Sequence, residues 1–122
     1  MIKLPQTEEQ LMQYIWEGES VFLKDIIEKY PEPKPAQTTI ATLLKRLVDK
    51  EFITYQTYGN SRAYSALIKK DDYFANHLNN MVENFFDNSP LRFASFFTKK
   101  GKMSKKELEE LKKIVDDQLK NS

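Results

Sequence analysis

The sequence contains no cysteine and only one histidine, His77, among its 122 residues. Without cysteine the chain has no disulfides, thiolate metal sites or thiol nucleophiles, and one histidine cannot build a histidine-based metal cluster. A glycine-rich phosphate loop and clustered carboxylates in a plausible site are also lacking. We therefore expect no catalytic residues, no metal and no cofactor, and we expect the protein to act by binding another molecule.

Long apolar runs are absent as well. No run could span a bilayer, and the N-terminus lacks a signal-peptide pattern. We therefore expect a cytoplasmic protein without membrane insertion. A hydrophobic content of 40% is sufficient for a small core, and the length fits one domain or one domain with an appendage.

Charge is distributed unevenly, although the net charge is only +1. Residues 7–32 carry seven acids and two lysines, a net charge of −5, whereas residues 34–70 carry seven bases and two acids, a net charge of +5. A polyanion would be attracted to the second segment and repelled by the first. Chance clustering is common in short chains, so this contrast needs support from the rest of the sequence.

The stretch Ala36–Lys50 organises the chain. Its apolar residues follow the i, i+3, i+4, i+7, i+8 spacing of one helical face, namely Ile40, Leu43, Leu44, Leu47 and Val48. The first two turns of the other face carry short hydrogen-bonding side chains and no acid. Such a face can enter a DNA groove, where Lys45 and Arg46 reach phosphates or guanine edges. For this stretch alone, the solvated face of an ordinary core helix is the alternative.

The flanking sequence predicts two earlier helices and a later hairpin. A capping box that begins at Thr7 predicts the first helix, with Trp16 as a core anchor and Gly18 as its stop. Three prolines force an extended connection after the second helix, and Pro35 suits the first turn of the third. β-Branched and aromatic residues, with a turn at 59–61, predict the strands. The expected elements are helices 7–17, 23–30 and 36–50 and strands 52–58 and 62–67.

Three helices followed by a hairpin is the order of a winged helix-turn-helix domain, which we place at residues 1–70 of a mostly α protein. In this fold the third helix enters the major groove, and the hairpin, called the wing, lies along the DNA backbone or minor groove. We therefore predict binding to double-stranded DNA. The candidate contacts lie on the third helix and the wing: Gln37, Thr38, Thr39, Thr42, Lys45, Arg46, Tyr58, Asn60, Ser61 and Arg62.

Residues 71–122 are predicted to form a helical dimerisation region. The pattern indicates helices from Asp71 to about Asp87 and at 91–98, a basic linker at 99–102, and a last helix capped by Ser104. Alone, this segment is too small to bury its large apolar side chains, so we expect it to pair with a second copy in a homodimer. Packing back on the winged helix is the alternative. The expected dimer core comprises Phe74, Leu78, Val82, Phe85, Phe86, Leu111, Ile114 and Val115.

The ordered set of these segments resembles the penicillinase-repressor (BlaI/MecI) family of bacterial transcriptional repressors. The resemblance runs from about Thr7 to Leu119. The residues that carry it are Glu8–Met12 with Ile15 and Trp16, then Thr39–Leu47 with Lys50–Ile53, then Ser104–Leu111. No single segment is specific for the family. The resemblance rests on the order and spacing of the whole set.

The resemblance implies a homodimeric repressor that covers a promoter operator until an inducing signal arrives. It implies DNA contacts by Thr39, Thr42 and Arg46, while Ala41 and Lys45 replace the arginine and threonine of well-known members. In antibiotic-responsive members a membrane sensor protease triggers cleavage between dimerisation elements. The matching bond here joins Phe96 and Phe97, and Phe96 replaces the asparagine of the family pattern. The paired cysteines of a copper-responsive branch are absent.

Two other classes of function remain open from the sequence. One is a winged-helix protein-interaction module without DNA binding, against which the acid-poor face of the third helix argues. The other is a ligand-sensing winged-helix regulator, in which the aromatic residues after Asp71 enclose a small molecule. Phenylalanine stripes are more often packing, and a ligand-induced rise in melting temperature would identify the second class.

Overall fold

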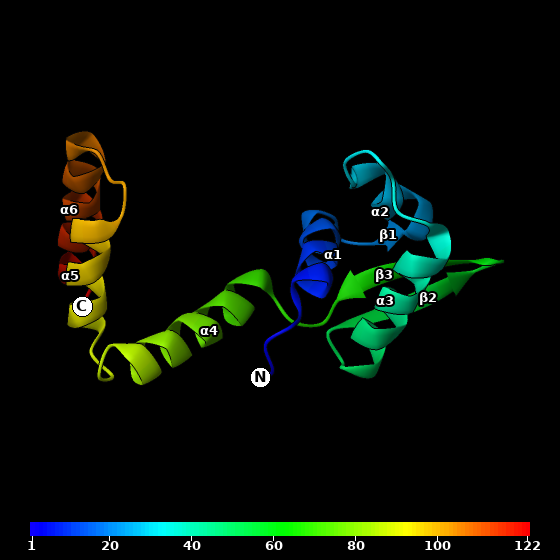
Figure 1. Ribbon diagram of the computed structural model, residues 1–122, viewed down its shortest axis with the longest axis horizontal. Helices are drawn as coiled ribbons and strands as arrows, with labels where there is room; N and C mark the ends of the chain where they lie inside the picture. The colour runs from blue at the N-terminus through cyan, green and yellow to red at the C-terminus, as the bar shows by residue number, and fades with distance from the viewer. The chain divides into compact units, whose positions relative to one another are not determined.

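The apolar stripes of the first half of the chain fold as three helices, α1 (Gln6–Glu17), α2 (Leu23–Lys29) and α3 (Gln37–Asp49). The computed structural model describes residues 1–122 (Figure 1). The inward faces of these helices pack into one core together with residues of the sheet. Its fully buried members include Leu11, Met12, Ile15, Ile26, Ile40, Leu44, Leu47, Phe52 and Ile53. The predicted apolar face of α3 is confirmed, with Leu43 and Val48 partly buried at its edges.

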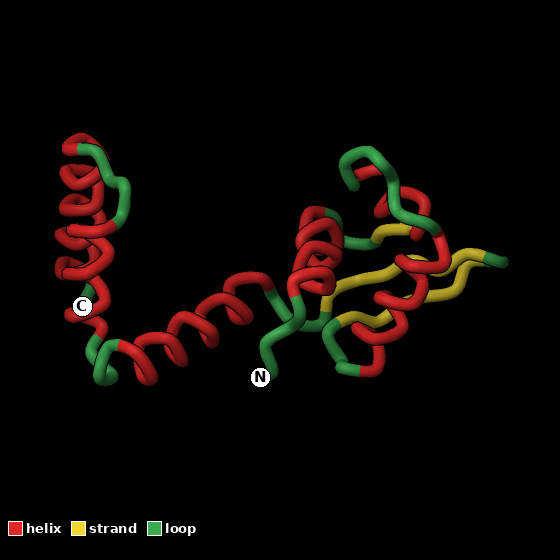
Figure 2. The backbone as a smooth tube through the Cα atoms, in the orientation of Figure 1, coloured by secondary structure: helices red, strands yellow, loops and turns green.

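A three-stranded antiparallel sheet completes the domain. Strands β2 (Ile53–Tyr58) and β3 (Ser61–Ala66) form the predicted hairpin, and β1 (Val21–Phe22) adds to β3 in the order β1-β3-β2. The hairpin turn is two residues long, because Tyr58 pairs directly with Ser61. Gly59 supplies the positive φ of 59° that such a turn requires. Figure 2 shows the hairpin tip extending past the helices of this domain. The winged helix-turn-helix fold is therefore confirmed.

The start of α1 differs from the predicted capping box. The helix begins at Gln6 with Pro5 as its N-cap, and no side chain caps it. The Pro5 carbonyl accepts the N–H groups of Glu8 and Glu9, each at 3.0 Å. These backbone hydrogen bonds start the helix before Thr7, so the Thr7 hydroxyl does not cap it. Pro35 likewise lies outside the first turn of α3, whose N-cap is Ala36.

The remaining residues form α4 (Lys70–Phe85), α5 (Pro90–Lys100) and α6 (Lys105–Lys120). The predicted capping box of the last helix is present, with Ser104 and Glu107 bonding each other's backbone N–H. Helix α5 is longer than expected, because Lys99 and Lys100 continue it instead of forming a linker. None of the helices combines the length and apolar composition needed to cross a membrane.

The chain divides into two compact units, Met1–His77 and Leu78–Ser122. Helix α4 contributes its first two turns to the first unit and the rest to the second. The functional domain ranges 1–70 and 71–122 remain a prediction.

Candidate nucleic-acid interface

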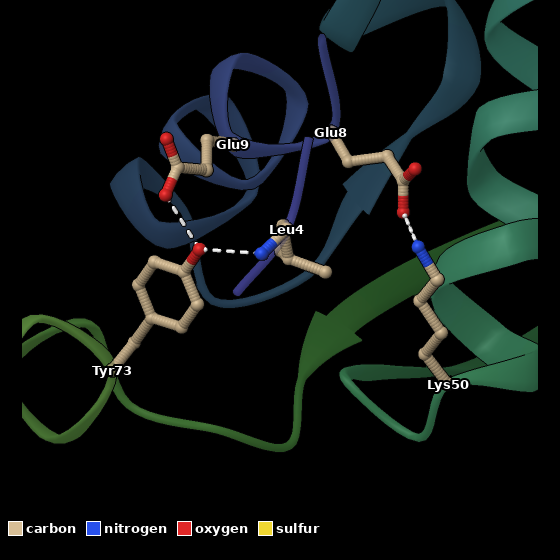
Figure 3. Close-up of polar contacts among 5 residues, drawn as sticks. All are labelled: Leu4, Glu8, Glu9, Lys50 and Tyr73. Atoms are coloured by element: carbon tan, nitrogen blue, oxygen red, sulfur yellow. Dashed lines mark hydrogen bonds and ion pairs between the residues drawn. The ribbon is translucent and has the colours of Figure 1, made fainter. Parts of the chain in front are cut away.

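Helix α3 is held to α1 by a partly buried ion pair at its C-terminal end. The Lys50 ammonium lies 2.6 Å from the Glu8 carboxylate, and the side chains of these residues are 29% and 3% exposed (Figure 3). Glu8 is the one buried charged residue of the chain. The pair and the apolar face of α3 together orient the polar face of this helix outward.

The first turns of α4 are bound to the N-terminal segment through Tyr73, which is fully buried. Its hydroxyl accepts the Leu4 N–H at 2.9 Å and donates to the Glu9 carboxylate at 2.5 Å (Figure 3). Burial, together with the hydrogen bond to Glu9, raises the pKa of Tyr73 to about 12. Trp16 packs against the ring of Tyr73 and donates its indole N–H to the Ile68 carbonyl at 2.9 Å. Trp16 thus lies at the partly buried edge of the core.

The outward face of α3 is polar and exposed over its whole length. All six predicted DNA-contact residues on this helix are exposed: Gln37, Thr38, Thr39, Thr42, Lys45 and Arg46. The Thr42 hydroxyl donates to the Thr38 carbonyl at 3.0 Å, and its oxygen can still accept a hydrogen bond. The Lys45 ammonium lies 3.1 Å from Asp49, and the side chains of this pair are 78% and 62% exposed. Such an exposed pair is weak, so Lys45 can exchange Asp49 for a phosphate.

A surface hollow of about 640 Å³ separates the wing from the helices, and we call it the first hollow. Its polar lining brings Gln37, at the start of α3, together with Asn60, Ser61 and Arg62 of the wing. Helix α2 adds Lys24 to the same hollow, and Phe22, Leu23 and Tyr64 complete the lining. The structure thus gathers four of the predicted contact residues around one concave surface with two cationic side chains.

A second hollow of about 410 Å³ lies between α3 and the strands. Arg62 lines this hollow too, together with Lys45, Asp49 and Tyr55 among others. The guanidinium carbon of Arg62 stands 4.3 Å from the centre of the Tyr55 ring, a cation–π contact that orients the side chain. Arg62 therefore borders both hollows and shares one with Gln37 and the other with Lys45.

Five predicted contact residues line neither hollow: Thr38, Thr39, Thr42, Arg46 and Tyr58. Four of them occupy the exposed face of α3. Tyr58 bonds Gln56 at 2.8 Å and contacts the ring of Phe22. Sequence reasoning missed Lys24, because it lies within the acidic segment 7–32, and it missed Tyr55, which alternation along β2 could have indicated.

The residues predicted for dimerisation differ in exposure. Val82 is buried and Phe86 and Leu111 are half-buried, whereas Phe74, Leu78, Phe85, Ile114 and Val115 are 43–79% exposed. Phe96 and Phe97, at the predicted cleavage bond, lie within α5 and are 52% and 49% exposed. Their rings belong to an aromatic cluster with Phe86 and Phe93, whose ring centres lie 5.4 Å apart. A large apolar surface thus remains uncovered in the second unit of a single chain.

Comparisons with known proteins agree with the resemblance seen in the sequence. Residues 4–117 match the family described as penicillinase repressor. The penicillinase repressor of Staphylococcus aureus is 30% identical over 119 residues, which cover 95% of this chain and 93% of that protein. The solution structure of the DNA-binding domain of the repressor BlaI aligns with a TM-score of 0.50 and 28% identity, over 60% of this chain and 94% of that one.

Proposed function

Because the chain belongs to the penicillinase repressor family, we propose that it is a DNA-binding transcriptional repressor without catalytic activity. The observation that carries this proposal is the exposed face of α3, whose first two turns carry no acid and whose start lies beside the basic wing. The solved BlaI structure is itself a DNA-binding domain. We propose that α3 enters the major groove and that the wing follows the backbone or minor groove.

Within this proposal the side chains have separate roles. Gln37, Thr38, Thr42 and Lys45 face base edges or nearby phosphates, while Thr39 and Arg46 position the helix on the backbone. Tyr58, Asn60, Ser61 and Arg62 make the wing contact. The Tyr55 ring already orients the Arg62 guanidinium, and this supports the wing contact, because an oriented side chain loses less conformational freedom when it binds DNA.

We further propose that the repressor acts as a homodimer on a palindromic operator. The large apolar side chains that α4 and α6 leave exposed support this, since exposed apolar side chains of this size need a covering partner when they gather on one surface. A symmetric dimer presents two copies of α3 to half-sites one or more helical turns apart.

Relief of repression by a membrane sensor protease completes the proposal. The bond between Phe96 and Phe97 corresponds to the cleavage position of antibiotic-responsive relatives and lies in α5, between elements of the proposed dimer core. Both side chains are half exposed, which supports access from solvent. Cleavage would require the α5 backbone to unwind locally, because its groups are engaged in helical hydrogen bonds.

The decisive experiment is a salt titration of binding to the upstream DNA of the encoding gene and to random DNA of equal length. Tight, steeply salt-dependent binding that prefers the upstream duplex is the expected result. Equal, weak binding to both duplexes would move the search to other promoters. A lack of binding to either duplex at low salt would contradict the proposal and favour a protein-interaction module.

A further inference from the structure

Lys24 is a cationic side chain of the first hollow that no sequence pattern indicated. It lies on α2, outside α3 and the wing, yet it lines the same concave surface as Gln37 and Arg62. The hollow is therefore bordered by a cation on each of two separate elements, α2 and β3. A backbone strand of DNA that passed along it would meet positive charge from both elements.

Lys24 differs from the lysines near it in the chain because its ammonium group has no partner. Lys29, on the same helix, lies 2.8 Å from the Glu17 carboxylate. The Lys34 ammonium is occupied by backbone carbonyls, including that of Glu28 at 2.7 Å. Lys24 is exposed and has no carboxylate within 4.0 Å, although it belongs to the acidic segment. Its charge is thus available to a ligand without breaking an existing ion pair.

We propose that Lys24 binds a backbone phosphate of DNA and that it holds, together with Arg62, the strand that runs through the first hollow. This inference rests on the proposed function. Arg62 also borders the second hollow, where Lys45 stands, so the three cations Lys24, Arg62 and Lys45 follow one another along the two hollows. Lys45 must break its ion pair with Asp49 to bind a phosphate, whereas Lys24 has no ion pair to break.

A contact of this type has a defined signature. A phosphate contact releases a condensed counterion, so each one contributes about −0.9 to the slope of log affinity against log salt. It carries no sequence information. Loss of Lys24 should therefore make this slope shallower by about 0.9 for each bound copy of the domain, and it should weaken binding to specific and random duplexes by the same factor.

The test compares Lys24→Gln with Lys29→Gln in the full-length protein. The two variants remove the same charge from the same helix, but Lys29 lines neither hollow and already has Glu17 as a partner. Binding is measured by fluorescence anisotropy over a salt series, on the upstream duplex and on a random duplex about two helical turns long. We expect a shallower slope on both duplexes for Lys24→Gln, a slope close to wild type for Lys29→Gln, and a retained slope for Lys24→Arg.

Two results would overturn the inference while the proposed function stands. One is a wild-type slope for Lys24→Gln in a protein that still binds DNA. The other is a loss confined to the upstream duplex, which would indicate a base contact instead. Failure of the wild-type protein to bind either duplex would instead contradict the proposed function itself. Thermal unfolding of each variant shows whether the fold is retained.

Discussion

The ammonium nitrogen of Lys50 lies 2.6 Å from a carboxylate oxygen of Glu8, and this ion pair joins the end of α3 to α1. The Glu8 side chain is 3% exposed, so removal of its partner would leave a buried carboxylate without a counter-charge. We expect Lys50→Met to lower the free energy of unfolding by about 2 kcal/mol. Water can reach Lys50, which is 29% exposed, and this keeps the cost below that of a fully buried pair. Urea denaturation at fixed protein concentration measures the change.

Lys45→Met is the matched control for this prediction. Lys45 also pairs with an acid, but both side chains of that pair are mostly exposed. We expect a change within about 0.5 kcal/mol, as is usual for surface ion pairs. Equal destabilisation by the two variants would show that burial of Glu8 does not set the strength of the ion pair.

The Tyr73 hydroxyl connects three segments, and its removal should destabilise the first unit. Tyr73→Phe leaves the Leu4 N–H without its acceptor and the Glu9 carboxylate without a donor. An unsatisfied buried polar group costs about 1–3 kcal/mol, and we expect a loss of unfolding free energy in that range. Tyr58→Phe serves as the control, because its hydroxyl bonds Gln56 at the surface. The prediction fails if the two variants lose stability equally in urea denaturation.

Tyr73 should also make stability depend on alkaline pH. Its pKa is raised from 10.0 to about 12 in the folded protein, so the folded state binds this proton more tightly than the unfolded state. The resulting stabilisation is fully present below pH 10 and is lost as pH rises toward about 12. We expect the urea midpoint to fall more steeply over this window in the wild type than in Tyr73→Phe. Burial also raises the pKa of Tyr30, which should leave a smaller dependence in the variant.

Long-range contacts explain which features the sequence could not predict. The helical face of α3 and the hairpin follow from local periodicity and turn chemistry, so both were predicted correctly. The pairing of Val21 with Tyr64 and the ion pair of Glu8 with Lys50 join residues more than 40 positions apart. No local pattern specifies such partners. The proximity of Lys24 to Arg62 arises in the same way, and the acidic composition around Lys24 pointed away from DNA.

The start of α1 illustrates a different kind of error. The sequence Thr7-Glu8-Glu9-Gln10 has the form of a capping box, but the Pro5 carbonyl begins the helix earlier. Glu8 then turns into the core, where Lys50 neutralises it. The capping-box pattern thus gives way to a backbone start at Pro5, and Glu8 makes a tertiary ion pair instead of a local cap.

Thr42 should affect which DNA sequence is preferred. Thr42 lies on the exposed face of α3, and its hydroxyl, which donates to the Thr38 carbonyl, can still accept a hydrogen bond. Thr42→Val keeps the shape and removes the hydroxyl, so binding to the preferred duplex should weaken by about 1–3 kcal/mol while random DNA is unaffected. Anisotropy titrations at one salt concentration measure both affinities. An equal effect on the two duplexes would contradict a base contact by Thr42.

Arg62, unlike Thr42, should affect binding to all DNA sequences equally. Arg62→Gln removes a cation that borders both hollows, so we expect weaker binding to every sequence and a shallower salt slope. Tyr55→Leu removes the ring beneath Arg62 and keeps its charge. We expect this second variant to weaken binding less and to leave the slope unchanged, because the number of phosphate contacts stays the same. If Tyr55→Leu matched Arg62→Gln in slope, the charge of Arg62 would not be the source of its effect.

Dimerisation should depend on the exposed apolar face of α6. Ile114 is 58% exposed in a single chain, and its loss should matter only if another surface covers it. We expect Ile114→Gln to shift the protein toward monomer in sedimentation velocity, because burial of an isoleucine contributes about 1.5–3 kcal/mol per site. Lys113→Gln introduces the same residue at an exposed polar position of α6 and should leave the dimer intact. A wild-type protein that is monomeric at all concentrations would contradict the proposed homodimer. If Ile114→Gln binds the whole operator more weakly but a single half-site with unchanged affinity, the apolar face of α6 couples the two DNA-binding domains.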